Sequence, residues 1–237
     1  ILASTYTNTT ATVINGDVGF TTGPASTPTG THTNYGSVAP YATAGTDQGI
    51  ALSALNSQSC TFTFAAGAID LATDTTHGPI GIYTPGVYCT SGATSVGTSG
   101  ITLNGSGTYI FRVNGALTTV ANSVVTLTGG ASACDVFWTP TSATTLGADS
   151  TFSGTDIDAS GITVGNTVRW IGRALAFGGT VTTDTDTVTA PSCSAPPTPA
   201  PTPTPTPVTP PLIDVKKMPS PLSLPTGPGL VTYTYTV

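Results

Sequence analysis

The chain has 237 residues, of which only 7% are charged, and its formal net charge is -6 at pH 7. Five lysines and arginines in the whole chain cannot build the basic surface that nucleic acids require, so nucleic acid is excluded as a partner. The apolar runs are too short for a membrane-spanning helix. Threonine supplies about one residue in five and glutamate is absent, which indicates a neutral, hydroxyl-rich surface.

The N-terminal segment resembles segments much later in the chain. TYTNTTATVINGDVGF aligns with ITVGNTVRWIGRALAF when Gly16 is matched to Gly172. We therefore expect residues 1–20 to form one more unit of the later repeat, docked between segments that are distant in sequence. After a turn-rich connection, the stretch from Tyr41 to Gln58 has small and apolar residues at helical spacing and predicts a single helix.

Four Thr-rich segments recur between Leu117 and Val188. Their starts lie roughly 20 residues apart, which is typical of one supersecondary unit stacked on the next. The segments are LTTVANS (Leu117 to Ser123), TTLGADS (Thr144 to Ser150), ITVGNT (Ile162 to Thr167) and VTTDTDT (Val181 to Thr187).

The stretches between these segments add further short β-prone runs, such as VVTLT, DVFW and VRWIG, with Gly, Ser, Asn or Asp between them. Each repeat thus offers three strands and three corners. Because alternate side chains of a strand point to opposite faces, the threonines form a ladder on one flat face while Leu, Ile and Val point inward. The sequence predicts an all-β fold with one helix: a three-sided β-solenoid (β-helix) with a single α-helix packed alongside.

Four cysteines form an even set without the spacing of a zinc site. They are Cys60, Cys89, Cys134 and Cys193, and they allow three disulfide connectivities. We expect Cys60 to pair with Cys89 and Cys134 with Cys193, because each bridge then ties the edge of a segment back to the solenoid.

The composition changes after Cys193, and we expect three parts. Residues 1–194 form the solenoid domain. Residues 195–211 (APPTPAPTPTPTPVTPP) are a Pro/Thr-rich linker, extended at roughly 3 Å per residue in polyproline II form. Residues 212–237 alternate like the start of a further β domain and end before a core is closed, so we expect more chain beyond them.

Several motifs resemble the ice-binding protein family of bacteria, fungi and algae. TATVINGDVG, TPGVYC, ACDVFW, TLGADSTFSG and GRALAFGGTVTTDTDTV occur in the family's order across residues 1–193. The resemblance implies a discontinuous right-handed β-solenoid with a long helix alongside and one flat face that binds ice. The connection from Thr21 to Pro40 is too short for the capping subdomain of that family. The tail, LIDVKKMPSPLSLPTGPGLVTYTYTV, resembles the start of an Ig-like repeat of bacterial surface proteins.

The family often binds ice through Thr-x-x-Thr or Thr-x-x-Asn repeats. Carried over residue by residue, the resemblance implies ice contacts at Thr7 with Thr10, Thr119 with Asn122, Thr163 with Asn166, and Thr182 with Thr185. The repeat from Thr145 departs from the pattern, because Ala148 stands in the fourth place. A threonine ladder suits ice because its methyl groups order nearby water, its hydroxyls bond to that water, and β-branched side chains are stiff before binding.

Other functions are weaker hypotheses. A cell-surface adhesin or carbohydrate-binding module could use the same Pro-rich spacer, but we expect Trp138 and Trp170 to be packing residues within apolar runs. Paired aspartates two residues apart, Asp156 with Asp158 and Asp184 with Asp186, have the spacing of a glycosidase pair. They fit turn caps better.

His32 and His77 lie in loops without an obvious carboxylate or cysteine partner, so we assign them no metal or general-base role. We expect a protein that is not an enzyme and needs no cofactor and no metal. The expected partner is an ice crystal surface, met by a monomer that causes thermal hysteresis and inhibits ice growth or recrystallisation. We expect it to be extracellular, either secreted or attached to a cell surface.

Overall fold

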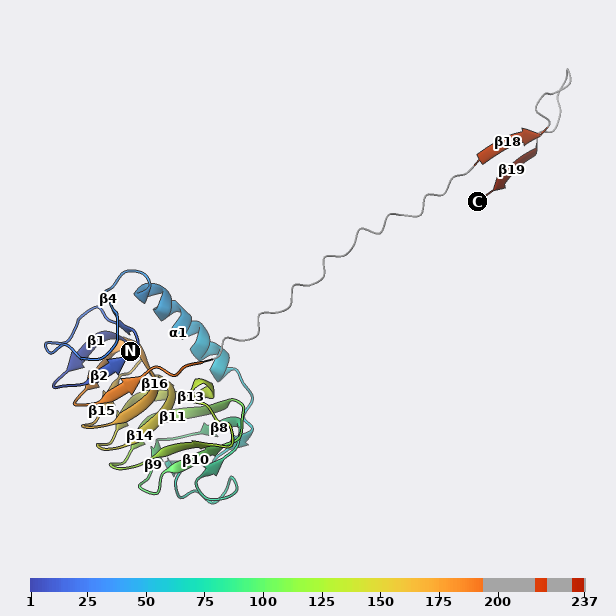
Figure 1. Cartoon of the computed structure of the whole chain (residues 1–237). Coiled ribbons are helices and arrows are strands. Elements are labelled where there is room, and N and C mark those ends of the chain that lie inside the picture. Colours follow the sequence, from blue (N-terminus) through green and yellow to red (C-terminus); the bar gives the residue numbers. More distant parts are fainter. Residues whose placement is uncertain (194–215, 221–231, 237) are drawn as a thin grey trace. The chain divides into compact units, whose positions relative to one another are not determined.

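The computed structural model describes residues 1–193, 216–220 and 232–236 (Figure 1). The chain divides into two compact units, Ile1–Cys193 and Ser194–Val237. The first unit contains the α-helix α1 (Tyr41–Asn56), the short 3-10 helix η1 (Ala133–Asp135) and the strands β1 (Leu2–Asn8), β2 (Val13–Asn15), β3 (Val18–Gly19), β4 (Asn34–Tyr35), β5 (Phe62–Thr63), β6 (Ile69–Asp70), β7 (Ile82–Tyr83), β8 (Gly86–Thr90), β9 (Thr94–Val96), β10 (Ile101–Asn104), β11 (Tyr109–Thr119), β12 (Val125–Thr128), β13 (Val136–Leu146), β14 (Thr151–Ile157), β15 (Ile162–Val164), β16 (Arg169–Thr183) and β17 (Thr187–Thr189).

The strands of the first unit stack on one another in parallel. The main path of the larger sheet runs β4-β3-β1-β16-β14-β13-β11-β8-β5, and a smaller sheet has the order β12-β10-β7. Every pairing between strands of this unit is parallel. Successive passages of the chain therefore lie about 4.8 Å apart, and equivalent side chains repeat along the stack. The unit is mostly β with one α-helix, as the sequence predicted.

The N-terminal strand takes the place in the stack that the alignment predicted. Strand β1 pairs in parallel with β16 on one side and with β3 on the other. Its register puts Tyr6 beside Val181 and Thr7 beside Thr182. The first residues of the chain thus continue the stack where β16 would otherwise be its edge, and no local sequence signal could have paired segments about 175 residues apart.

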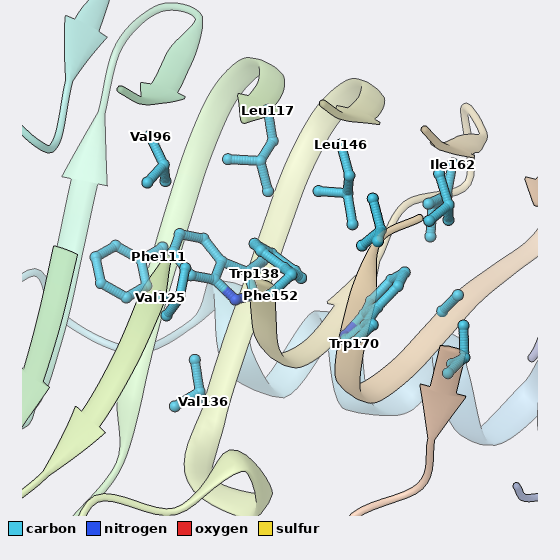
Figure 2. Close-up of a cluster of buried hydrophobic side chains, with 14 of the residues drawn as sticks. Val96, Phe111, Leu117, Val125, Val136, Trp138, Leu146, Phe152, Ile162 and Trp170 are labelled. Carbon is cyan, nitrogen blue, oxygen red and sulfur yellow. The ribbon is translucent and has the colours of Figure 1, made fainter. Parts of the chain in front are cut away.

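The core is a continuous file of aromatic and aliphatic side chains inside the stack (Figure 2). The rings of Phe111 and Trp138 stack with centroids 4.2 Å apart, and Phe152 and Trp170 continue the file. Both indole N–H groups donate to backbone carbonyls, Trp138 Nε1 to Ser153 at 3.0 Å and Trp170 Nε1 to Gly154 at 2.8 Å. The rings are therefore buried without leaving an indole donor unsatisfied, and both tryptophans are packing residues as predicted.

The helix lies along the stack and packs against β1, β13 and β16. The phenol of Tyr41 donates to the carbonyl of Ala3 at 3.0 Å, and the backbone N–H of Phe177 donates to the side chain of Gln48 at 3.1 Å. A Cβ at Gly45 would lie 2.3 Å from the Phe177 ring, so the helix approaches the sheet through this glycine. Glycine is a poor helix former, but at this position it is what lets the helix dock.

Two disulfide bridges close the first unit, Cys60–Cys89 and Cys134–Cys193, which is the expected pairing. The first bridge anchors the chain just after the helix to β8. The second ties the end of the unit to η1. In the chain-entropy model, closing loops of 29 and 59 residues is worth roughly 3.5 and 4 kcal/mol.

In the second unit, β18 (Lys216–Ser220) pairs antiparallel with β19 (Thr232–Thr236). The predicted linker, residues 195–211, lies outside the described residues. Within the described parts of the chain, no helix is both long and apolar enough to cross a membrane.

Candidate functional site

Six hydroxyl side chains form one unbroken row across the stack. Each is the Cα partner of the next in a parallel pairing. Their strands differ in length, and β1 is far from its partner β16 in sequence, but all share one register. We call this set the threonine row: Ser95, Thr118, Thr145, Thr163, Thr182 and Thr7.

The row points outward because its neighbours along each strand point inward. Thr145 is exposed between the buried Thr144 and Leu146, and Thr163 is exposed between the buried Ile162 and Val164. Six members at about 4.8 Å per step make a row of five steps, about 24 Å long. Thr118, Thr145 and Thr163 are exposed, and the other three members are half-buried.

The structure corrects one residue of the predicted face. Thr119 is only 5% exposed, and its hydroxyl accepts a hydrogen bond from the Gly147 N–H at 2.9 Å and contacts Ser150 Oγ at 3.3 Å. Its neighbour Thr118 is the Cα partner of both Ser95 and Thr145. A shift of one residue moves a strand side chain to the other face, so Thr118, and not Thr119, belongs to the outer face.

A second file of residues runs along the corner beside the threonine row. Asn122, Asp149, Thr167 and Thr185 have φ between 58° and 63°, and they are the only non-glycine residues with positive φ in the described part of the chain. Backbone hydrogen bonds hold them in line, from the N–H of Asn122 to Ala148, from Asp149 to Asn166, and from Thr167 to Asp184. We call these four residues the corner row.

Two corner-row members are strained. Asn and Asp tolerate the left-handed conformation, but a β-branched residue there is a conformational outlier that costs on the order of 1–3 kcal/mol. Thr167 and Thr185 both adopt it. Glycine at these two positions would relieve the backbone strain. The presence of threonine at both therefore indicates that the hydroxyl-bearing side chain has a function there.

The three remaining predicted positions, Thr10, Ala148 and Asn166, lie next to the corner row but are not members of it. Thr10 is exposed, and its Oγ1 lies 2.5 Å from that of Thr185. Ala148 and Asn166 directly precede corner-row members and are half-buried and exposed, respectively. The fourth place of the Thr-x-x-Asn pattern therefore falls on the corner row at Asn122 and Thr185. It falls one residue before the corner row at Ala148 and Asn166.

The sequence carried a signal for the missed residues. In the segments from Leu117, Thr144, Ile162 and Val181, the second place is Thr118, Thr145, Thr163 and Thr182, which is the structural register. The segments LTTVANS and TTLGADS both end in a buried serine, Ser123 and Ser150. Aligning the two segments on these serines matches Asn122 with Asp149, and not with Ala148.

Neither competing aspartate pair presents two carboxylates to solvent. Asp156 and Asp158 are fully buried, and neither carboxyl oxygen of Asp156 has a hydrogen-bond partner among the described residues. Burial raises the pKa of Asp156 well above its usual value. Asp186 is 1% exposed, and its carboxylate accepts the N–H groups of Val168 and Asp184 at 2.8 and 2.7 Å, which is the expected turn cap. Burial raises its pKa to about 6.

His77 is not without a partner, contrary to the expectation. Its Nδ1 lies 2.8 Å from Asp74 Oδ2, its Nε2 lies 3.1 Å from the Ile82 carbonyl, and its ring stacks on Tyr83 with centroids 4.0 Å apart. Both ring nitrogens are thus engaged in closing a loop. No group of three or more metal-ligating side chains occurs within the described residues.

A groove of about 650 Å³ lies between the helix and the ends of β1, β2 and β17. Tyr41, Gln48 and Arg173 are among its lining residues, and no member of the threonine row or the corner row is. The exposed hydroxyl face is therefore a separate feature of the molecule.

Several solved ice-binding proteins are similar in fold to this parallel β stack with a helix alongside. One from the Antarctic ascomycete Antarctomyces psychrotrophicus is 29% identical with a TM-score of 0.66, over 79% of this chain and 92% of that one. One from an Antarctic bacterium of the Flavobacteriaceae is 29% identical with a TM-score of 0.70, over 82% of this chain and 46% of that one.

Sequence comparison leads to the same family. The model of the ice-binding-like family matches residues 1–189, and the chain belongs to this family. An ice-binding protein of Flavobacterium frigoris is 37% identical over 95 residues, 39% of this chain and 34% of that protein. One of Lentinula edodes is 40% identical over 75 residues, 31% and 26% of the two chains. The matched stretches span about a third or less of these two relatives.

Proposed function

We propose that this chain binds ice through its threonine row and corner row, and that this adsorption gives thermal hysteresis and inhibits ice growth or recrystallisation. The observation that carries the proposal is the unbroken register of six outward hydroxyl residues from Ser95 to Thr7. Family membership supports it, because the named relatives are ice-binding proteins. The family is named for binding and not for a reaction, in line with a protein that is not an enzyme.

A row of this kind suits a crystal surface for three physical reasons. Its spacing, about 4.8 Å, is set by backbone hydrogen bonds and does not depend on flexible side chains. Its β-branched side chains lose little rotamer freedom on binding. Each threonine presents a methyl group and a hydroxyl together, so the surface can both order water and bond to it. The array is therefore organised before it meets ice, which lowers the entropy cost of adsorption.

The threonine row is also free of cations. On the next side of the stack, Arg169 is exposed between its Cα partners Thr151 and Thr187. The five fixed N–H donors of a charged guanidinium would hold water in orientations unlike those of a lattice. At the far end of the row, Asp70 is the partner of Ser95, but its carboxylate accepts the N–H groups of Ala72 and Gly97 at 2.9 Å. The absence of a cation from the threonine row, and the presence of Arg169 on the neighbouring side, favour the threonine row as the ice-binding face.

We further propose that the stack is a right-handed, three-sided β-solenoid. The pairings support three sides, because one passage of the chain contributes three separate paired segments. An example is Val136–Pro140, followed by Thr144–Leu146 and then by Thr151 onward in β14. Handedness follows the rule for parallel crossover connections.

We propose an extracellular location, with residues 1–194 as the ice-binding domain, residues 195–211 as a linker and residues 212–237 as the start of an Ig-like β domain. Two disulfides support an oxidising compartment. The row is complete within one chain, so a monomer suffices for this mode of action.

The test is direct adsorption. Fluorescently labelled protein should coat a single ice crystal and alter its shape during slow growth in dilute solution. A crystal that grows unlabelled and unshaped at micromolar protein would rule out ice as the partner.

A further inference from the structure

Two carboxylates stand beside the proposed ice-binding face, where an exposed charge would be unfavourable. Asp149 is a member of the corner row, and Asp184 immediately precedes another member, Thr185. Exposed anions organise water around themselves, and that arrangement competes with the order of a lattice. The hydrogen bonds of these carboxylates explain how the face tolerates them.

At Asp184 the carboxylate is the acceptor for two hydroxyl groups. Thr10 Oγ1 lies 2.5 Å from Asp184 Oδ1, and Thr185 Oγ1 lies 3.2 Å from the same oxygen. Thr10 and Thr185 are also 2.5 Å apart through their hydroxyl oxygens. Hydrogen bonds to the carboxylate, from Thr10 above all, hold the pKa of Asp184 below its usual value. The group is therefore an anion at neutral pH.

Each hydroxyl has one proton, and this limits how the network is arranged. The Thr10 proton goes to the carboxylate, which is the strongest acceptor in reach. The Thr185 proton then goes either to Thr10 Oγ1 or to Asp184 Oδ1, and both choices point it into the cluster. What remains for outside water is a set of acceptor lone pairs, on the two hydroxyl oxygens, whose rotation is blocked, and on the second carboxylate oxygen of Asp184.

Asp149 has a similar arrangement two passages earlier in the stack. Its Oδ1 accepts a hydrogen bond from the hydroxyl of Thr167, whose other acceptor in reach is its own neighbour, the Asn166 carbonyl, at 2.7 Å. As at Asp184, the donor is a threonine of the neighbouring layer of the stack, and the hydroxyl proton is directed to the carboxylate. Both strained threonines of the corner row, Thr167 and Thr185, thus have an aspartate carboxylate as a hydrogen-bond acceptor within reach.

We infer that Asp184 and Asp149 are positioning residues of the ice-binding face: their carboxylates take up the protons of Thr10, Thr185 and Thr167, so that the corner presents fixed hydrogen-bond acceptors to the lattice. This inference rests on the proposed function. The role assigned to the aspartates is to orient the neighbouring hydroxyl groups, and it gives the strained backbone a purpose, since the left-handed conformation places each threonine within reach of its carboxylate.

The test separates hydrogen-bond acceptance from charge. Asp184→Ala removes the acceptor, whereas Asp184→Asn keeps one acceptor oxygen, removes the charge and turns the other oxygen into an amide donor. Asp17→Ala is the control, because Asp17 is an exposed aspartate in neither row. We expect Asp184→Ala to lose hysteresis, and Asp184→Asn and Asp17→Ala to keep it, with melting temperatures measured in parallel. Equal loss in the Ala and Asn variants, or full activity in Asp184→Ala, would overturn the inference.

A second measurement does not involve ice. In supercooled solution, proton NMR should detect slowly exchanging hydroxyl protons of Thr10 and Thr185 in the wild type and their loss in Asp184→Ala. Equally fast exchange in both proteins would refute the network itself. Failure of the proposed function has a different signature: the hydroxyl protons would be protected while the wild-type protein left ice unaffected.

Discussion

Replacing Thr163 by tyrosine tests the threonine row where it is most sensitive. Thr163 is exposed, with two members of the row on one side (Thr182 and Thr7) and three on the other (Thr145, Thr118 and Ser95). A ring standing above the row keeps a flat lattice plane from touching both flanks together. The ice plane can then contact at most the three members on one side of the ring. A gap of about 1 Å between the ice and a remaining member loses a quarter to a half of that dispersion contact. We expect most of the thermal hysteresis to be lost.

This substitution should have little effect on the stability of the fold. Tyrosine is a good strand residue at an exposed strand position, so the free energy of unfolding should change by no more than about 0.5 kcal/mol. For a domain of this size that is about 1–2 °C in melting temperature.

Thr126→Tyr is the matched control, because Thr126 is exposed in β12 on the smaller sheet. The assay is nanolitre osmometry on both variants at equal concentration, with circular dichroism and thermal melts alongside. Unchanged hysteresis in Thr163→Tyr, or equal loss in both variants, would refute the assignment of the face.

Three further outcomes are expected. Thr118→Tyr should lower hysteresis without affecting stability. Thr119→Val should lower the free energy of unfolding by about 1 kcal/mol in a denaturant titration and leave hysteresis intact. The reverse result would place Thr119, and not Thr118, on the ice-binding face. Thr167→Gly should relieve a strained backbone and raise stability by about 1 kcal/mol while hysteresis falls, and a variant that gained both would contradict a role for this side chain. Asp156 has a raised pKa in the folded state, so its contribution to stability is fully present below pH 4 and is lost as the pH rises through the folded value. Asp156→Asn should therefore melt like the wild type at pH 4 but at a higher temperature at pH 8, and an equal difference at both pH values would count against this reasoning.

Features that depend on local pattern were readable from the sequence. The spacing of small and apolar residues predicted a helix from Tyr41, and the helix runs to Asn56. Alternation within TTLGADS and ITVGNT identified Thr145 and Thr163 as outward residues, because the side chains of a strand alternate strictly. The internal similarity between the N-terminus and the ITVGNT repeat predicted that the first strand joins the stack, as the pairing of β1 with β16 confirms.

The sequence by itself thus determined the kind of fold and the family, since periodicity and motif order are properties of the chain alone. Only the tertiary structure decided the members of the face. Thr118 and Thr119 are equally good β-formers, and their roles differ because cross-strand register puts one beside Thr145 and the other against Gly147. Likewise, the hydrogen bonds between Thr10 and Asp184 join residues 174 positions apart. Such contacts depend on which passages of the chain are neighbours, and a local reading of the residues cannot supply that.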